Sequence, residues 1–218
     1  SIRYYKEALK LVKELNFKPG ISAVLTNLGE SYLSIKNYDS ALAYQRQALE
    51  IKKELEDKLG MGRVYNNLAN VFIYSKSFDL DSGLFYFNKG LQIGREMKDS
   101  QQNALSLYGL LRAYYIGGNL DKAKPIADEL LTTLDSLQDL SLASDSYDHI
   151  SLLYASLGNV NKALQFRTLR NVLLDSLLSD ERTKISQEIE AKYQNEQKAK
   201  EIALLESENQ LQSLQIEK

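Results

Sequence analysis

The 218-residue chain contains no cysteine and no tryptophan, and it has one histidine and two prolines. Without cysteine there is no thiol nucleophile, no disulfide and no cysteine-ligated zinc or iron–sulfur site. The scarcity of proline, together with abundant Leu, Ala, Glu, Lys and Gln, favours helix almost throughout. We therefore expect an all-α protein.

The chain also lacks an excess of charge of one sign and a long apolar run. Its 27 basic residues are balanced by 29 acidic ones, which gives a net charge of −2. A nearly neutral chain has no sequence-wide field that attracts nucleic acid, so we expect no nucleic-acid binding by this region. No segment approaches the roughly 20 apolar residues that cross a bilayer, and the N-terminus lacks the core of a signal peptide. Any membrane span is expected outside these residues.

Candidate catalytic and metal-binding residues are few. The sole histidine, His149, follows Asp145 and Asp148, but no third ligand has a spacing that completes a metal site. The glycine-containing segments 60–62 and 116–119 lack the lysine of a phosphate-binding loop, and no serine has a GxSxG context. We expect no catalytic site, cofactor or metal, and we interpret His149 as a surface or groove histidine. An enzyme that uses His149 is the least favoured alternative.

What the sequence does contain is a repeat with a period near 40 residues. The four copies lie at 27–51, 63–93, 106–131 and 146–170. They align on one apolar column, whose members are Leu28, Leu68, Leu110 and Ile150 and are spaced by 40, 42 and 40 residues. A fixed period of this size is typical of a solenoid, in which each copy is one supersecondary unit.

Each copy has the pattern of two helices joined by a turn. In the first copy, Leu28 and Tyr32 belong to one helical stripe, and Ala41 and Tyr44 belong to a second. The break between the stripes holds residues suited to helix ends, namely Asn37, Asn119 and Asn159. Small residues such as Gly29 beside the aromatics predict close helix packing, with the small residues making holes for aromatic rings of the facing helix.

Two copies carry irregularities in their turns or second helices. The longer step from the second to the third copy is expected to come from two extra residues within 78–83. This alignment places Tyr38, Phe78, Leu120 and Val160 in one column. Pro125 lies early in the second helix of the third copy, where we expect it to cause a late start or a bend.

The first copy, NLGESYLSIKNYDSALAYQRQALEI, resembles the tetratricopeptide repeat. It has a Leu-Gly pair, an aromatic three residues later, a turn with Asn, and then an Ala, an aromatic and a second Ala. The resemblance implies an all-α, right-handed superhelical solenoid of helical hairpins with a long C-terminal helix.

The implied array occupies residues 1–179. It contains the second helix of an incomplete repeat at 1–15, followed by four repeats that start near residues 22, 62, 104 and 144. The missing first helix implies that further residues precede Ser1 in the parent chain.

A concave face formed by the first helices is the binding surface that this resemblance implies. Its residues would be Thr26, Asn27, Glu30, Ser34, Asn66, Asn67, Asn70, Tyr74, Tyr108, Arg112, Tyr115, Asp148 and Leu152. Amide and tyrosine side chains suit an extended peptide, so we expect a protein or peptide ligand. The alternative for Asn27 and Asn67 is that they satisfy local backbone groups. Arg112 and Asn70 are expected to suit a carboxylate, but the Lys/Asn clamp of some family members is absent, because Glu30 and Gly109 occupy two of its positions.

Residues 180–218 are rich in Glu, Gln and Lys and contain no Gly or Pro, which predicts one long helix. Ile185, Ile189 and Tyr193 are spaced by four and are expected to cover the last hairpin. A short coiled-coil seam is predicted from Ile202, Leu205, Asn209, Gln212 and Ile216, with Asn209 as the polar register position. The seam favours a homodimer, and the alternative is a solvated amphipathic helix.

The segment KYQNEQKAKEIALLESENQLQ (192–212) is similar to a linker found in Bacteroidetes sensor histidine kinases and membrane-bound helix-turn-helix regulators. This resemblance implies that the chain is the periplasmic sensory region of a two-component signalling protein, whose C-terminal helix leads to a membrane span. The alternative is a free-standing adaptor or scaffold protein of the same fold, in which case the location would be cytoplasmic.

Overall fold

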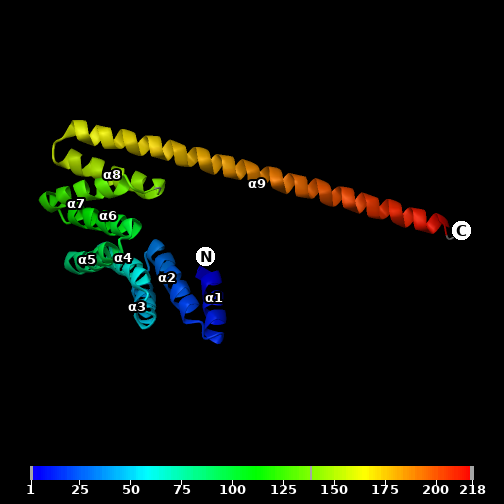
Figure 1. Ribbon diagram of the computed structural model, residues 1–218, viewed down its shortest axis with the longest axis horizontal. Coiled ribbons are helices and arrows are strands. Elements are labelled where there is room, and N and C mark those ends of the chain that lie inside the picture. The colour runs from blue at the N-terminus through cyan, green and yellow to red at the C-terminus, as the bar shows by residue number, and fades with distance from the viewer. Residues whose placement is uncertain (1, 138, 217–218) are drawn as a thin grey trace. The chain divides into compact units, whose positions relative to one another are not determined.

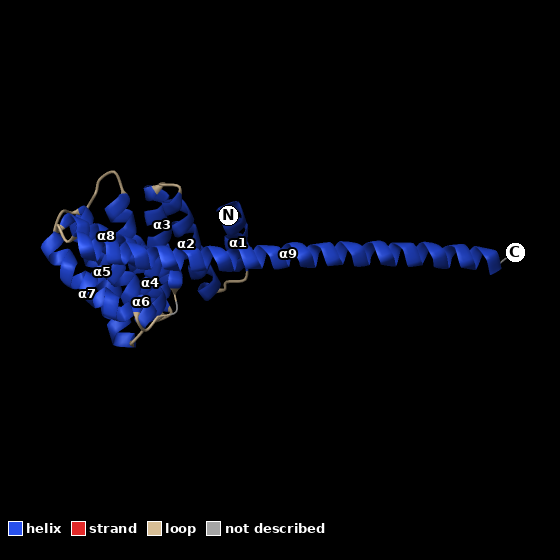
Figure 2. Ribbon diagram, turned by 90° about the horizontal axis from the view of Figure 1, so that it is seen from above, coloured by secondary structure: helices blue, strands red, loops and turns tan. Residues whose placement is uncertain are grey.

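The computed structural model describes the backbone of residues 2–137 and 139–216, and the side chains up to Lys198 apart from those at positions 180, 193 and 196. Within these residues every regular element is a helix, and short turns join the helices (Figure 2). They are α1 (Ile2–Glu14), α2 (Lys18–Ser34), α3 (Tyr38–Glu54), α4 (Lys58–Tyr74), α5 (Leu80–Met97), α6 (Ser100–Ile116), α7 (Leu120–Leu134), α8 (Leu140–Ser156) and α9 (Val160–Ile216). The expected all-α class is confirmed.

The chain divides into two compact units, residues 1–170 and residues 171–218. In the first unit, α2 packs on α3, α4 on α5, and α6 on α7, so each pair is an antiparallel hairpin (Figure 1). The start of α9 pairs with α8, because the Ser151 hydroxyl donates to the carbonyl of Ala163 at 2.8 Å. The first helices α2, α4, α6 and α8 also contact one another in chain order. This serial packing confirms a helical solenoid.

Polar residues fix where the helices begin. From α3 onward each helix is preceded by a residue whose side-chain oxygen accepts the backbone N–H three positions later. These residues are Asn37, Asp57, Asp79, Asp99, Asn119, Asp139 and Asn159. Since such a cap stabilises a helix by about 1 kcal/mol, the hairpin boundaries are encoded locally in the sequence.

Stacked aromatic rings join the two helices of three hairpins. The pairs, with their centroid distances, are Tyr32 with Tyr44 (5.4 Å), Phe72 with Tyr86 (5.6 Å) and Tyr154 with Phe166 (5.6 Å). The equivalent positions of the third hairpin hold Tyr114 and Ile126. Offset ring pairs add about 0.5–1.5 kcal/mol beyond the burial of their area, so the ring pairs reinforce the first, second and fourth hairpins.

The holes beside the small residues are filled in two ways. A Cβ on Gly109 would lie 2.1 Å from the ring of Phe87, which is the aromatic packing that the sequence predicts. A Cβ on Gly29 would instead meet the amide of Gln45 at 2.4 Å. The expectation of an aromatic ring at Gly29 is therefore wrong, because Tyr44 turns toward Tyr32 and the next residue fills the hole.

The second hairpin has the longer turn, but its alignment differs from the expected one. The turn comprises residues 75–79, whereas the first hairpin has residues 35–37. Because Asp79 is the N-cap, Leu80 is the first helical residue and corresponds to Tyr38. The expected equivalence of Phe78 with Tyr38 is wrong, and Phe78 is 43% exposed in the turn.

Pro125 does not delay the start of its helix. Helix α7 begins at Leu120, directly after the Asn119 cap, as the equivalent helices do in the other hairpins. Pro125 lies inside this helix, where it removes one intrahelical hydrogen bond without displacing the cap. The expected late start is therefore wrong.

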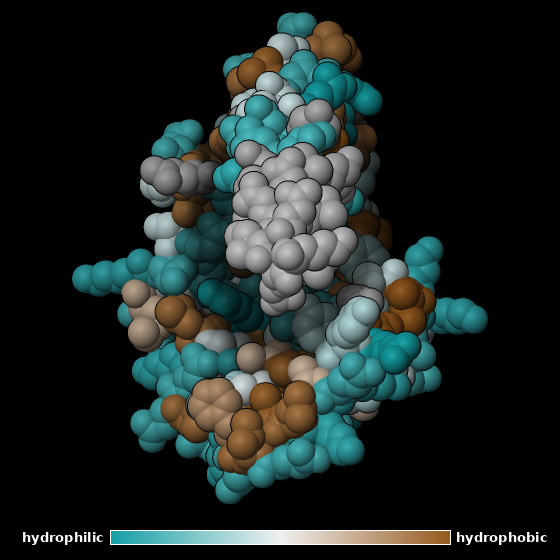
Figure 3. Space-filling model, turned by 90° about the vertical axis from the view of Figure 1, so that its right-hand side faces the viewer, coloured by the Kyte–Doolittle hydropathy of each residue, from teal (hydrophilic) through white to brown (hydrophobic). Residues whose placement is uncertain are grey.

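Helix α1 presents apolar side chains at the end of the array. Tyr4 is 74% exposed, whereas its equivalent Tyr44 is half-buried against Tyr32. Leu11, Leu15 and Phe17 are also exposed. Figure 3, which views the molecule from the side of α1, shows apolar side chains gathered along the lower edge of a mostly hydrophilic face. Among the described residues, α1 packs on α2 alone, whereas α3 packs on both α2 and α4.

Helix α9 shows no break at Asp180, where the composition changes. The side chains of Ile185 and Ile189 are 49% and 64% exposed, and the expected cap of the last hairpin stays a prediction. Tyr193 and the predicted seam residues Ile202, Leu205, Asn209, Gln212 and Ile216 lie outside the described side chains. Among the described residues, no helix combines the length and apolar character needed to cross a membrane.

Candidate functional site

Three hollows follow one another along the inner helices α2, α4 and α6. The first hollow (390 Å³) is lined by Ala23, Thr26, Asn27, Glu30, Lys52, Asp57, Leu59, Gly60 and Arg63. The central hollow (260 Å³) is lined by Glu30, Arg63, Asn66, Asn67, Asn70, Phe87, Leu105, Tyr108, Gly109 and Arg112. The turn hollow (340 Å³) is lined by Leu33, Ser34, Lys36, Tyr38, Asn70, Tyr74 and Arg112.

These hollows share lining residues, so they form one continuous groove. Glu30 and Arg63 belong to both the first and the central hollow. Asn70 and Arg112 belong to both the central and the turn hollow. A ligand that occupies the central hollow can therefore extend on either side of it.

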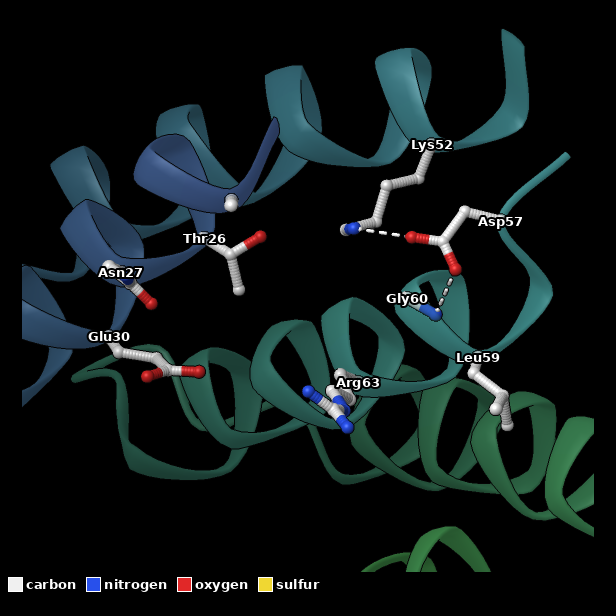
Figure 4. Close-up of a pocket in the computed structure, with 9 residues that line it drawn as sticks. Thr26, Asn27, Glu30, Lys52, Asp57, Leu59, Gly60 and Arg63 are labelled. Carbon is white, nitrogen blue, oxygen red and sulfur yellow. Dashed lines mark hydrogen bonds and ion pairs between the residues drawn. The ribbon is translucent and has the colours of Figure 1, made fainter. Parts of the chain in front are cut away.

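The charges of the first hollow are largely paired within the protein. Figure 4 shows Thr26 and Glu30 of α2 facing Lys52, Asp57 and Arg63. The Lys52 Nζ lies 2.7 Å from the Asp57 Oδ2, and the backbone N–H of Gly60 donates to the Asp57 Oδ1 at 2.9 Å. Burial raises the pKa of Asp57, but the hydrogen bonds from Lys52 and Gly60 outweigh it and hold the pKa below its ordinary value. Asp57 is therefore ionised at neutral pH.

Arg112 lines the central hollow and contacts two aromatic rings. Its guanidinium lies 4.9 Å from the ring centroids of both Tyr74 and Tyr108, so it makes a cation–π contact with each ring. The Nε atom is buried and has no hydrogen-bond partner among the described residues. Burial lowers the pKa of Arg112 and the carboxylate of Asp145 raises it, yet a guanidinium remains charged in proteins. The hollow thus contains a fixed positive charge with an unused donor.

Asn66 supplies a second unused donor, and a buried hydrogen-bond chain orients it. The residue is 7% exposed, and its Oδ1 accepts from the Ser106 hydroxyl at 2.9 Å. Ser106 in turn accepts from the Gln102 Nε2 at 3.1 Å, and the same nitrogen donates to the carbonyl of Gly90 at 3.3 Å. The Asn66 Nδ2 has no partner among the described residues. Because Oδ1 is engaged by Ser106, the Nδ2 of Asn66, a residue that lines the central hollow, is a buried donor without a partner.

Asn67 bridges adjacent hairpins. Its Nδ2 donates to the Glu30 Oε1 at 2.8 Å, which joins α4 to α2. The alternative expectation for Asn67 was a hydrogen bond to a local backbone group. The contact with Glu30 is instead a side-chain contact between two helices. The bond also satisfies part of the Glu30 carboxylate at the boundary between the first and central hollows.

His149 lies beside the groove and is hydrogen-bonded within the protein. Its Nδ1 lies 3.0 Å from the backbone carbonyl of Asp145 and 3.4 Å from the Tyr108 hydroxyl. Burial, reinforced by Asp145 and Asp148, raises the pKa of Tyr108, so its phenol is neutral. Within the described residues there is no cluster of three or more His, Cys, Asp or Glu side chains that suits a metal ion.

Three predicted groove residues, Tyr115, Asp148 and Leu152, line none of the three hollows. The Tyr115 hydroxyl lies 3.4 Å from the Ser156 hydroxyl, and the Asp148 Oδ1 lies 3.7 Å from the Arg170 Nε. The groove does bring together the other predicted residues, which are Thr26, Asn27, Glu30, Ser34, Asn66, Asn67, Asn70, Tyr74, Tyr108 and Arg112.

Sequence reasoning missed several lining residues. Arg63 and Leu105 share the repeat column of Ala23, so the period could have identified them. Lys52 and Phe87 come from second helices, and no repeat signal assigns a second-helix residue to the inner face.

The stacked hairpins and the continuous inner groove define a helical-repeat protein of the interaction type. The tetratricopeptide repeat family matches residues 1–54 and 21–96. This match covers the first 96 of the 218 residues, and the helices beyond them continue the same hairpin fold. A search of curated proteins gave no significant match.

Several solved structures have similar folds. BtubC (BKLC) from P. vanneervenii is 20% identical, with a TM-score of 0.65 over 79% of this chain and 71% of that one. The apo form of RapI is 16% identical, with a TM-score of 0.66 over 84% and 73%. The TPR-like repeats assigned to a kinesin light chain of P. anserina are 13% identical, with a TM-score of 0.58 over 81% and 86%. At these identities the similarity concerns the fold.

Proposed function

We propose that this protein is a non-catalytic interaction module that binds an extended peptide, or an extended segment of a protein, in its inner groove. The observation that carries the proposal is the continuity of the three hollows through Glu30 and Arg63 on one side and Asn70 and Arg112 on the other. A continuous groove suits a chain better than a compact small molecule, which would occupy one hollow.

The chemistry of the lining agrees with a peptide ligand. The asparagines offer donors and acceptors to a peptide backbone, and the tyrosines provide contact area at low entropic cost. Tetratricopeptide repeats generally bind protein or peptide partners and are typically non-catalytic. His149 is hydrogen-bonded to a backbone carbonyl, so it lacks the carboxylate partner expected of a catalytic base.

A groove-blocking substitution tests this function. An array of random decapeptides, acetylated and amidated at their ends, is probed with the wild-type protein and with Asn70→Trp, which fills the junction of two hollows. Asn88→Trp is the matched control, because Asn88 is exposed on α5 and lines none of the three hollows. We expect Asn70→Trp to weaken peptide binding at least tenfold and Asn88→Trp to preserve it. Absence of any bound peptide, or equal binding by both variants, would contradict the proposal.

We further propose that the module is the periplasmic sensory region of a bacterial two-component histidine kinase. The similarity of residues 192–212 to linkers of such kinases supports this proposal, as does the course of α9, which continues from the last hairpin without interruption. In this arrangement α9 relays a change in the array toward a membrane span outside these residues. Sequencing of the parent gene beyond Lys218 is the test, and an apolar span followed by kinase motifs is the expected result.

A free-standing cytoplasmic adaptor or scaffold protein is the second candidate. The fold similarity to repeats assigned to a kinesin light chain supports this alternative. It predicts that the parent gene encodes neither a span nor a kinase after Lys218. The groove would then bind one component of a complex while the outer helices remain available to others.

A further inference from the structure

We propose that the central hollow binds an acidic side chain of the peptide, with its carboxylate held by Arg112 and Asn66. The inference rests on the proposed peptide-binding function and adds the chemical class of the residue that the groove selects.

The unused hydrogen-bonding atoms of the central hollow are donors. The Arg112 Nε and the Asn66 Nδ2 are both buried and have no partner among the described residues. A carboxylate carries only acceptors when ionised, so it can satisfy both groups at once. The oxygen of a neutral amide can also accept hydrogen bonds, but it carries no charge to pair with the guanidinium, so its hydrogen bonds are weaker than those of a carboxylate.

Both donors are held in place before a ligand arrives. The guanidinium of Arg112 lies 4.9 Å from the ring centroids of both Tyr74 and Tyr108, and these two cation–π contacts restrain it. The chain from Gln102 through Ser106 fixes the Oδ1 of Asn66. A preorganised pair loses little conformational entropy on binding, which favours affinity and a defined geometry.

The charge of this part of the groove complements an acid. The central and turn hollows are lined by the cations Lys36, Arg63 and Arg112 and by one carboxylate, that of Glu30. Asn67 donates a hydrogen bond to the Glu30 carboxylate, and this bond reduces the repulsion between that carboxylate and an incoming anion. Asp145 acts on Arg112 through space, but no ion pair joins the two. The lining is therefore positive, whereas the whole chain carries a net charge of −2.

The shape of the groove favours a side-chain carboxylate over a C-terminal one. The groove continues beyond the central hollow into the first hollow and into the turn hollow. A bound segment therefore has room on both sides of the residue that enters the central hollow. Phe87 and Leu105 provide an apolar surface in this hollow, which suits the methylene groups of a glutamate.

The decapeptide array tests the inference directly, because its blocked ends leave side chains as the sole source of carboxylates. We expect the peptides bound by the wild-type protein to be enriched in Glu or Asp at one position. Replacing that residue with Gln or Asn should weaken binding at least tenfold. In Arg112→Gln the enrichment should disappear, and the acidic and amide peptides should bind equally. Arg46→Gln is the matched control, since Arg46 is exposed on α3 and lines none of the three hollows.

Two further variants separate a binding role of Arg112 from a structural one. Arg112→Lys keeps the charge but loses the planar fork, so we expect reduced preference for the acidic peptide with an unchanged melting temperature. Ser106→Ala frees the Oδ1 of Asn66, and it should also reduce the preference without touching the ligand. A preference that is unchanged in both variants and in Arg112→Gln would overturn the inference.

The outcomes distinguish this inference from the proposed function. Peptides that bind the wild-type protein and not Asn70→Trp, but show no acidic enrichment, would overturn the acidic-residue assignment and leave the peptide groove intact. Absence of any bound peptide would overturn both. If free C-termini restore binding that blocked peptides lack, the side-chain source of the carboxylate is wrong.

Discussion

The amide of Gln45 lies over Gly29 in the first hairpin, and its Nε2 donates to the backbone carbonyl of Thr26 at 3.1 Å. Gln45 is 1% exposed, so this is a buried polar contact between α3 and α2. Thr26 lines the first hollow. The contact therefore links the packing of the hairpin to the wall of the groove.

Gly29→Ala is expected to destabilise the protein. The new Cβ would stand 2.4 Å from the Gln45 Nε2, so the amide must leave its hydrogen bond. The lost bond and repacking outweigh the gain of about 1 kcal/mol from alanine in a helix, for a net loss of about 1–2 kcal/mol. Urea unfolding measures the change. Adding Gln45→Ala should recover part of the loss, and strictly additive effects of the two substitutions would contradict the proposed clash.

Gly109→Ala is expected to cost more than Gly29→Ala. Its Cβ would lie 2.1 Å from the ring of Phe87, and a buried ring cannot rotate aside as a flexible amide can. We expect a loss of about 2–4 kcal/mol in the free energy of unfolding, because overpacking forces the ring and backbone to shift. Phe87 lines the central hollow, so peptide affinity should also fall. Urea titration and peptide binding are the measurements. A loss in the free energy of unfolding no larger than that of Gly29→Ala would contradict this expectation.

Lys36→Gly is expected to stabilise the protein. Lys36 has a φ of 60° in the turn of the first hairpin, where the third and fourth hairpins have Gly118 at 72° and Gly158 at 75°. A left-handed conformation costs a residue with a Cβ about 1 kcal/mol, and glycine avoids this cost. We expect a gain of about 0.5–1 kcal/mol in thermal or urea unfolding.

Gly118→Ala is the reciprocal control for the Lys36 substitution. A Cβ at Gly118 would meet no atom within 4 Å, so its effect isolates the backbone conformation. We expect a loss of about 1 kcal/mol. Changes of the same sign in Lys36→Gly and Gly118→Ala would contradict the backbone explanation.

The ion pair of Asp57 with Lys52 predicts a pH dependence of stability. The folded state holds the pKa of Asp57 below its ordinary value of 3.8. The contribution of this carboxylate is therefore complete above pH 3.8 and is lost as the pH falls through the folded-state pKa. Asp57→Asn keeps an N-cap but removes the titration. Between pH 5 and pH 2.5, about the range of this transition, the wild type should lose more stability than the variant, by less than about 1 kcal/mol because the pair is partly exposed. Parallel pH profiles would rule out the contribution.

Removal of residues 198–218 tests the predicted homodimer seam. If Ile202, Leu205, Asn209 and Ile216 form a coiled coil between two chains, light scattering should give twice the monomer mass for the full chain and the monomer mass for the shortened one. Asn209→Leu is the companion variant, since an apolar residue at a polar register position changes the oligomeric state. Identical monomer masses for the full and shortened chains would end the dimer hypothesis.

The sequence by itself determined the helical hairpins and their order. The caps, from Asn37 to Asn159, depend on neighbours within a few residues, and the apolar column that begins with Leu28 follows the 40-residue period. Both patterns can be counted along the chain, so the fold class was predictable. The resemblance to the tetratricopeptide repeat assigned Asn66 and Arg112 to the groove, but not the state of their hydrogen-bonding groups.

The tertiary structure alone decided which groups meet and which donors remain unused. Gln45 rather than an aromatic ring fills the hole at Gly29, and Ser106 occupies the Oδ1 of Asn66 but not its Nδ2. The tertiary structure also places the second-helix residues Lys52 and Phe87 in the lining of the groove. These contacts join residues on different helices, so they follow from the distance and rotation between packed helices, which no local pattern specifies.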